Sequence, residues 1–410
     1  MKAIVLGGCG AVGSNAVKTL VKTETFAEVV IGDFNEGKAS EMVAQLGGKL
    51  SFVKMDATDR ASIATAIDGC DLVVNCVGPF YSTVENILAT VIEAGIDYVD
   101  VCDDPDVTLK ILELDRKAKD AGILALIGMG ASPGITNLLG KLIAEDFLDE
   151  TNSIDIFHTH GGESIEGEGV IGHRFHCMSI DIPMYLDGEL KYVKYFEKDG
   201  MALRQLFDFP VIGKNIPVFP YPHPEQLTMP EYIKLKQVTN KGSVLPIPYY
   251  ELTSELCRMG FADDEPLMVK GHTVKPYDFA VAYIIRERKR ILEETGFGSQ
   301  RGAMSVVVKG SKGDKPQEYR VHIVSSDKAL GEGTGIPAAV GAILLGQGKL
   351  SGKGVLPPEA CVDPKEFIEV VKPLMDMTEQ ADGKVADSSI IFEHVDETGI
   401  VTVLDFEWGI

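Results

Sequence analysis

The first half of the chain alternates short apolar runs with amphipathic stretches. The apolar runs predict strands at 3–6, 28–31, 50–54, 72–76, 98–101 and 124–127, and the amphipathic stretches predict helices near 12–22, 36–46, 60–68, 83–94 and 105–120. Runs such as Leu72-Val73-Val74 carry no polar face, which is typical of parallel strands covered on both sides. The pattern predicts an α/β fold built on a Rossmann doubly wound parallel sheet.

The pattern changes after a turn-rich bridge at 128–134. Ser132 and Pro133 suit the cap and the start of a helix over 135–147. Longer alternating strands follow at 154–158, 303–309 and 319–324, with a hairpin at 310–314 and a helix at 278–294. These elements predict a second α+β domain with a mostly antiparallel sheet. We interpret the Pro- and Tyr-rich segment 209–248 as an ordered loop covering a cleft.

The predicted domains follow from this change of pattern. Residues 1–131 would form the dinucleotide-binding Rossmann domain, and 132–330 a substrate-binding and dimerisation domain. A helix at about 334–350 would return to the Rossmann domain. Residues 351–410 would form a C-terminal extension packed partly on both domains.

A glycine motif follows the first strand. Gly8, Gly10 and Gly13 form G-x-G-x-x-G, and Asp33 ends the second strand twenty residues later. The first glycine allows the tight turn, the second lets a pyrophosphate approach the backbone, and the third packs helix on strand. The helix start, which includes Ala11 and Val12, attracts phosphate, and the Asp33 carboxylate accepts hydrogen bonds from a ribose. The motif therefore predicts a dinucleotide site.

The residues around Asp33 bear on which dinucleotide binds. A 2′-phosphate would meet the negative charge of this carboxylate. Directly after it there is no arginine, and Lys38 is the only positive charge near in sequence. We expect NAD as the cofactor, with NADP possible.

Ligands of doubly wound sheets lie beyond the carboxyl ends of the strands. Asp56 is expected either to accept from the adenine amino group or to cap the helix at 59–68. The end of the fourth strand is expected along the nicotinamide ribose, unless it is a plain turn, and Cys102 ends the fifth strand. The residues concerned at the fourth strand are Asn75, Cys76, Val77, Gly78 and Pro79.

Composition excludes several classes of protein. The net charge of −22 argues against nucleic acid and against anionic membrane surfaces, which require a basic face. No apolar run approaches the roughly 18 residues of a membrane span. The seven cysteines contain no C-x-x-C pair, so we expect neither a zinc site nor disulfides. We expect a soluble, cytoplasmic enzyme of two domains, acting as a homodimer.

Several segments together resemble the saccharopine dehydrogenase-like family. They are Gly8–Gly13 with Asp33, Asp71–Asn75, Gly95–Asp100, Ala118–Ile123, Gly130–Asn137, Gly333-Thr334 and Gly354–Glu359. The chain looks most similar to lysine 6-dehydrogenase, and carboxynorspermidine dehydrogenase also belongs to this family. Agreement is least over 158–250. The resemblance implies NAD(P)-dependent oxidation of a C–N bond through an imine, with an amino acid or polyamine as substrate.

Candidate catalytic residues lie beyond the fifth strand and in the second domain. Asp103 and Asp104 would hold a substrate ammonium or take the imine proton; alternatively, they cap the helix that Pro105 begins. His176 is a candidate acid or base. Arg174 would grip a substrate carboxylate with its planar fork. Further substrate contacts are expected at Gly162, Glu163 and Ser132.

Three other interpretations are weaker. A metal cluster of His158, His160 and the histidines at 173 and 176 is disfavoured, because strand histidines are more often packed or solvent-facing. An extended short-chain reductase would need Tyr-x-x-x-Lys in the first domain, and the only match is Tyr232 with Lys236. A non-catalytic dinucleotide sensor would not need the long polar second domain.

Overall fold

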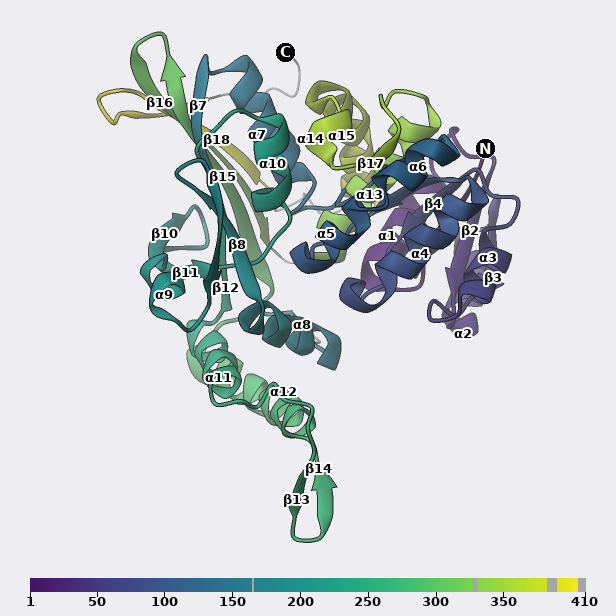
Figure 1. Cartoon of the computed structure of the whole chain (residues 1–410), viewed down its shortest axis with the longest axis horizontal. Helices are drawn as coiled ribbons and strands as arrows, with labels where there is room; N and C mark the ends of the chain where they lie inside the picture. Colours follow the sequence, from purple (N-terminus) through teal and green to yellow (C-terminus); the bar gives the residue numbers. More distant parts are fainter. Residues whose placement is uncertain (164–165, 327–329, 382–388, 405–410) are drawn as a thin grey trace.

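The computed structural model describes residues 1–163, 166–326, 330–381 and 389–404. Figure 1 shows a parallel sheet flanked by helices on one side of the molecule and a larger sheet on the other. The parallel sheet has the order β17-β6-β5-β4-β1-β2-β3. Its strands are β1 (Lys2–Leu6), β2 (Glu28–Asp33), β3 (Leu50–Lys54), β4 (Leu72–Asn75), β5 (Asp97–Asp100), β6 (Leu124–Leu126) and β17 (Gly354–Leu356).

The helices between these strands confirm the predicted doubly wound fold. The predicted helix 105–120 is two helices, because the chain turns at residues 113 and 114. The helices are α1 (Ala11–Leu20), α2 (Glu36–Leu46), α3 (Arg60–Ile67), α4 (Phe80–Ala94), α5 (Pro105–Leu112) and α6 (Asp115–Ala121).

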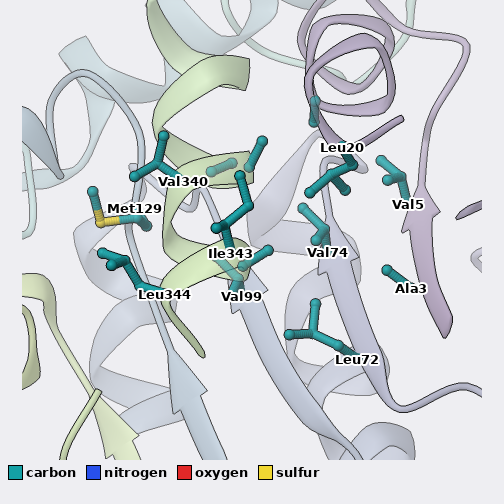
Figure 2. Close-up of a cluster of buried hydrophobic side chains, with 14 of the residues drawn as sticks. Ala3, Val5, Leu20, Leu72, Val74, Val99, Met129, Val340, Ile343 and Leu344 are labelled. Carbon is teal, nitrogen blue, oxygen red and sulfur yellow. The ribbon is translucent and has the colours of Figure 1, made fainter. Parts of the chain in front are cut away.

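The returning helix, α13 (Leu330–Gly346), completes the core of the Rossmann domain. Figure 2 shows Ile343 beside Val74 and Val99 of the sheet, and Val340 and Leu344 on the side of Met129. All six side chains are at most 2% exposed. Burial of each such aliphatic side chain stabilises the fold by about 1.5–3 kcal/mol. A segment from the far end of the chain therefore holds the first domain together.

The second sheet is mixed. Its order is β10-β11-β12-β7-β15-β16-β18-β19, with β8 and β9 attached beside β12. Only the central pair β12–β7 is parallel among the pairings described for this sheet. The strands are β7 (Glu150–Gly161), β8 (Asp181–Leu186), β9 (Glu189–Lys194), β10 (Gln205–Phe209), β11 (Gly213–Pro220), β12 (Gln237–Leu245), β15 (Arg301–Lys312), β16 (Lys315–Ser326), β18 (Ser389–Val395) and β19 (Val401–Leu404).

Helices cover this sheet and extend from it. A hairpin of β13 (Leu267–Val269) and β14 (His272–Val274) projects away from the body (Figure 1). No helix in the described part of the chain is long and apolar enough to cross a bilayer. The helices are α7 (Ile135–Asp146), α8 (Glu168–Ser179), α9 (Lys198–Ala202), α10 (Glu225–Tyr232), α11 (Ile247–Arg258), α12 (Pro276–Thr295), α14 (Pro358–Cys361) and α15 (Pro364–Ala381).

The interpretation of segment 209–248 as a loop is wrong. The segment contains β11, α10 and β12, and β12 lies beside β7 in the middle of the sheet. Strand β12 is buried along nearly its whole length and includes polar residues, so it shows no alternation. Its Thr239 hydroxyl donates to Asp155 Oδ1 at 2.6 Å, which satisfies the buried group. The prolines near its end also disfavoured the prediction of a strand.

The chain after residue 351 divides between the two sheets. Strand β17 joins the Rossmann sheet beside β6, whereas β18 and β19 extend the second sheet. The predicted domain boundaries stay a prediction.

A buried polar bond closes the joint between the domains. Asn137, in the first turn of α7, accepts from the backbone N–H of Gly134 at 2.8 Å. Its amide nitrogen donates to Glu359 Oε2 at 2.8 Å. Both side chains are buried. The segments 130–137 and 354–359, which stood out in the sequence, therefore meet at this joint.

The Glu359 carboxyl predicts a pH dependence of stability. Burial raises its pKa to about 7, whereas a glutamate in the unfolded chain titrates near ~4.3. The folded pKa is the higher one, so stability is full below the unfolded value and falls until pH passes about 7. Relative to Glu359→Gln, the wild-type free energy of unfolding should fall by up to about 4 kcal/mol between acidic and mildly alkaline pH. Urea unfolding of both proteins at several pH values measures this, and parallel pH curves would contradict it.

Candidate active site

A cleft of about 750 Å³ opens between the two sheets. Its Rossmann wall contains Gly78, Pro79 and the carboxyl end of β5, and its floor includes the linking turn at Ser132. The opposite wall comes from β7, β12, β15 and α8. The cleft thus lies where a doubly wound sheet binds its ligands.

The glycine loop has the shape that a dinucleotide requires. A Cβ on Gly13 would overlap the carbonyl oxygen of Gly7, so only glycine allows α1 to approach β1 this closely. Gly10 is the N-cap of α1, and a Cβ there would meet only the Gly7 carbonyl oxygen, at 3.3 Å. Gly13 therefore allows the close packing of helix on strand that was predicted for the third glycine. The space before Gly10 is open for phosphate at the helix N-terminus.

Asp33 joins this loop to the end of β2. Its Oδ2 accepts from the backbone N–H of Cys9 at 2.9 Å, and its Oδ1 accepts from the backbone N–H of Asn35 at 2.9 Å. The residue is 6% exposed, whereas the next residue, Phe34, is 78% exposed. The carboxylate is therefore fixed beside the glycine loop, where an adenosine ribose would meet it.

The other predicted cofactor residues divide into two groups. Gly78 and Pro79 line the cleft. The Asn75 side chain points into the sheet: it donates to the Tyr98 hydroxyl at 2.9 Å and accepts from the Val77 backbone N–H at 3.0 Å. It shapes the turn after β4. The Cys102 side chain is 1% exposed and packs in the core, so only its backbone is available to a ligand.

For Asp56, the predicted capping of the helix at 59–68 is wrong, whereas the predicted contact with adenine stays a prediction. Its Oδ1 accepts from the backbone N–H of Thr58 at 2.9 Å and from the Thr58 hydroxyl at 2.7 Å. These bonds fix a turn before α3, which Asp59, and not Asp56, caps. The residue is exposed at the carboxyl end of β3, where an adenine can reach it.

The two carboxylates beyond β5 face the second domain. Asp104 occupies the N-cap position of α5 but makes no side-chain capping bond, so a purely capping role is wrong for it. Its Oδ2 accepts from the backbone N–H of Tyr81 at 3.1 Å. The ring of His173 on α8 approaches both acids, with Nδ1 3.5 Å from Asp104 Oδ1 and Nε2 3.8 Å from Asp103 Oδ2. Burial, together with the charge of Asp103, raises the pKa of Asp104 to about 6.

His176 does not occupy the place predicted for an acid or base. Its Nε2 lies 3.6 Å from Asp106 Oδ2, and its ring stacks on Tyr81 with centroids 4.6 Å apart. Among the described residues, His173 lines the cleft and His176 does not. The two histidines are three positions apart on α8, so that the His173 ring faces the cleft and the His176 ring faces α5. His173 is the histidine near the carboxylates.

Arg174 lines the cleft, but its charge is already paired. Its guanidinium donates to Glu166 and, at 3.2 Å, to the Tyr249 hydroxyl. The side chains of Arg174 and Glu166 are each 4% exposed. Arg288 contacts the other oxygen of Glu166 at 2.8 Å. These contacts argue against Arg174 as the predicted carboxylate clamp, because Glu166 is its carboxylate.

The predicted contacts at 162 and 163 are partly structural. A Cβ on Gly162 would meet Phe297 and the Ser299 carbonyl oxygen at 2.8 Å, so this glycine serves packing. Glu163 lines the cleft and pairs with His160, Oε1 to Nδ1, at 2.7 Å.

Sequence reasoning missed two groups of the cleft wall. Arg301, at the start of β15, stacks on Phe297 with 4.3 Å from guanidinium carbon to ring centroid, and its buried Nε has no hydrogen-bond partner. No carboxylate of the described residues lies within ion-pair distance of it. His223 pairs with Glu225 in the segment interpreted as a loop. In the sequence, the available signal for this pair was the close spacing of His223 and Glu225 between prolines.

The short-chain reductase interpretation also fails on geometry. Tyr232 ends α10, in the second domain, and Lys236 directly precedes β12. The pair lies outside the Rossmann domain where such enzymes need it.

Comparisons with known proteins agree with the architecture. Residues 3–126 match the family described as saccharopine dehydrogenase NADP binding domain, and residues 130–383 match the saccharopine dehydrogenase C-terminal domain. Carboxyaminopropylagmatine dehydrogenase of Synechocystis sp. is 23% identical over 392 residues, covering 90% of this chain and 94% of that protein. Carboxynorspermidine synthase of Vibrio cholerae is 22% identical over 409 residues, covering 89% and 93%.

A solved structure shows the same fold. The apo, L-Glu forming saccharopine dehydrogenase of Saccharomyces cerevisiae superposes with a TM-score of 0.65 at 15% identity, covering 95% of this chain and 99% of that chain. With both family matches spanning most of the sequence and a glycine loop shaped for a dinucleotide, the chain belongs to the saccharopine dehydrogenase family and is an NAD(P)-dependent dehydrogenase acting on CH–NH donors.

Proposed function

We propose that this enzyme reversibly joins a carboxylate-bearing carbonyl compound to a polyamine-type amine, forming a secondary amine. The observation that carries the proposal is the charge pattern of the cleft, in which Asp103 and Asp104 line one wall and Arg301 lines the other. A substrate with a cationic amine and a carboxylate complements this pattern. The names of two relatives also describe polyamine compounds that carry a carboxyl group.

Each wall has a distinct role in this proposal. The carboxylates at the end of β5 attract the ammonium groups of the amine and hold its nitrogen near the nicotinamide side of the cleft. The guanidinium of Arg301 binds the carboxylate with parallel hydrogen bonds. The bound dinucleotide supplies or accepts the hydride. Apolar side chains of the cleft, such as Ile336 and Val244, keep water from the reacting carbon.

A substrate panel tests the reaction class. Amino-acid semialdehydes would be paired with diamines, agmatine and longer polyamines, and reduced cofactor would be followed by absorbance. We expect turnover for pairs that carry both a carboxylate and at least two amino groups. Equal turnover of aldehydes without a carboxylate would contradict the proposal.

Substitution of Arg301 tests how the carboxylate is bound. Arg301→Ala should lower kcat/KM for a carboxylated substrate by about 30- to 1,000-fold, which corresponds to the 2–4 kcal/mol typical of a buried charged contact. The cost should vanish for the analogue without the carboxylate. The exposed Arg286→Ala is the matched control. A loss of equal size with both substrates would show that Arg301 serves only the fold.

We propose NAD as the preferred cofactor. The Asp33 carboxylate is fixed by two backbone N–H groups at the ribose end of the site. A 2′-phosphate at this place would face like charge. Asp33→Ser with Phe34→Arg should raise the NADP to NAD ratio of kcat/KM by about 10- to 100-fold, since the new guanidinium bonds the phosphate. Steady-state kinetics with both cofactors measures the ratio, with Phe34→Ala as control. An unchanged ratio would mean that the ribose lies elsewhere.

The glycine loop yields a separate prediction. Gly10→Val should abolish dinucleotide binding in a folded protein, because the added side chain occupies the open space where the pyrophosphate would lie. Calorimetric titration with NAD measures the loss. Gly13→Ala is the contrasting variant, because its Cβ overlaps backbone and should lower thermal stability instead. Unchanged NAD affinity in folded Gly10→Val would contradict the assignment.

We propose that the enzyme is cytoplasmic and forms a homodimer. The projecting hairpin supports the homodimer, because Leu267, Met268 and Val269 are 57%, 70% and 48% exposed. An exposed apolar strand of this kind is typical of a surface that another chain covers.

A further inference from the structure

A buried polar cluster lies in the cleft wall beside the linking turn. Its centre is the imidazole of His223, whose Nδ1 lies 3.3 Å from Glu225 Oε2 and 3.1 Å from Ser132 Oγ. Glu225 is fully buried and His223 is 6% exposed. No role in the preceding mechanism accounts for an ionisable pair at this depth.

The hydrogen bonds fix the protonation of the pair. Glu225 Oε1 accepts from the hydroxyls of Ser132, at 2.6 Å, and Thr136, at 2.8 Å. Burial alone would raise the pKa of Glu225, but the adjacent His223 and the hydroxyl of Ser132 lower it. The carboxylate is therefore ionised at neutral pH and serves as an acceptor for His223.

The same network sets the tautomer of His223. The only proton of the Ser132 hydroxyl is donated to Glu225, so Ser132 Oγ accepts from its other neighbours. One of these is Asn240, whose Nδ2 lies 3.3 Å away. The other is His223, so Nδ1 must carry hydrogen. Nε2 is then the free acceptor of the ring, and the ring lines the cleft.

The groups packed around the ring do not carry competing charge. His158 on β7 stacks with it at 5.8 Å, and burial holds the pKa of His158 well below its usual range, so this imidazole is neutral. Tyr221 meets the ring edge-on at 5.2 Å, and burial raises the pKa of its hydroxyl far above the usual value. Glu225 on α10 is the one ionised group in contact with His223 among the described residues.

We infer that His223, oriented by Glu225 and Ser132, is the acid–base catalyst of the C–N reaction. The inference rests on the proposed function. When the amine nitrogen attacks the carbonyl carbon, a C–N bond forms and the C=O double bond becomes a single bond. His223 Nε2 takes the proton that the nitrogen loses, and the former carbonyl oxygen takes a proton from solution to become a hydroxyl. The imidazolium then protonates the hydroxyl, which leaves as water. Hydride delivered to the resulting iminium carbon completes the secondary amine, and one proton from solution is consumed overall.

This inference gives Ser132 another role than the sequence predicted. The prediction was a contact with substrate, but the Ser132 hydroxyl is hydrogen-bonded to Glu225, His223 and Asn240. It is a positioning residue, as is Glu225. The residue that touches the substrate in this proposal is His223.

The test uses a variant that preserves the network. In His223→Asn, the amide nitrogen of asparagine reproduces the Nδ1 donor to Glu225 and Ser132 but leaves no Nε2. We expect kcat with a carbonyl–amine pair to fall by about 100- to 10,000-fold, and NAD affinity to change less than twofold. The exposed His272→Asn is the control. Wild-type kcat in His223→Asn would overturn the assignment.

A second variant separates catalysis from folding. Glu225→Gln keeps the shape of the side chain but removes the negative charge beside Nδ1 of His223, so kcat should fall while NAD affinity changes less than twofold. Nitrogen NMR of the wild type should show hydrogen on Nδ1 of neutral His223, and hydrogen on Nε2 would overturn the assignment. An unchanged kcat in Glu225→Gln would do the same. If the wild-type enzyme joins no carbonyl–amine pair, the proposed function fails; if it does so and His223→Asn is equally active, only this inference fails.

Discussion

The return of α13 to the Rossmann domain determines how the rest of the molecule is held. Its side chains pack between α1 and the sheet, where Val340 and Ile343 are almost fully buried. The helix is apolar around most of its circumference, so it is stable only inside a core. The chain also crosses between the domains at α7 and again between β17 and β18, so three connections link the two sheets. The cleft therefore lies between two sheets that the chain joins three times.

The polar groups at this joint carry the second constraint. Asn137 of α7 donates a hydrogen bond to Glu359 on α14. Thr136, the residue before it, donates one to Glu225 on α10. Neighbouring residues of α7 thus connect the joint to the proposed acid–base pair. Burial of such polar groups costs free energy unless each group has a hydrogen-bond partner. Their positions are therefore well defined only in the folded state, where these partners come together.

Charge in the cleft is divided between paired and available groups. Arg174 is neutralised by Glu166 and contributes to the frame of α8, whereas Arg301 lines the cleft and has no carboxylate of the described residues within ion-pair distance. A pattern of residue types does not distinguish these two arginines. Their neighbours do, since a buried ion pair leaves little charge for a ligand.

The amino-acid sequence was enough to predict the Rossmann sheet, the glycine loop with Asp33, the returning helix and the β15–β16 hairpin. These features depend on local periodicity and on glycine geometry, which are written in short windows of residues. It also placed Asp103 and Asp104 at the cleft, because strand ends locate ligands in this fold. The three-dimensional fold was needed to show that β12 is a central strand, since its buried polar residues are satisfied by distant partners such as Asp155. It likewise decided that His173 faces the cleft and His176 does not, and that His223 meets Glu225 and Ser132 there. Contacts between residues some ninety positions apart leave no periodic trace along the chain.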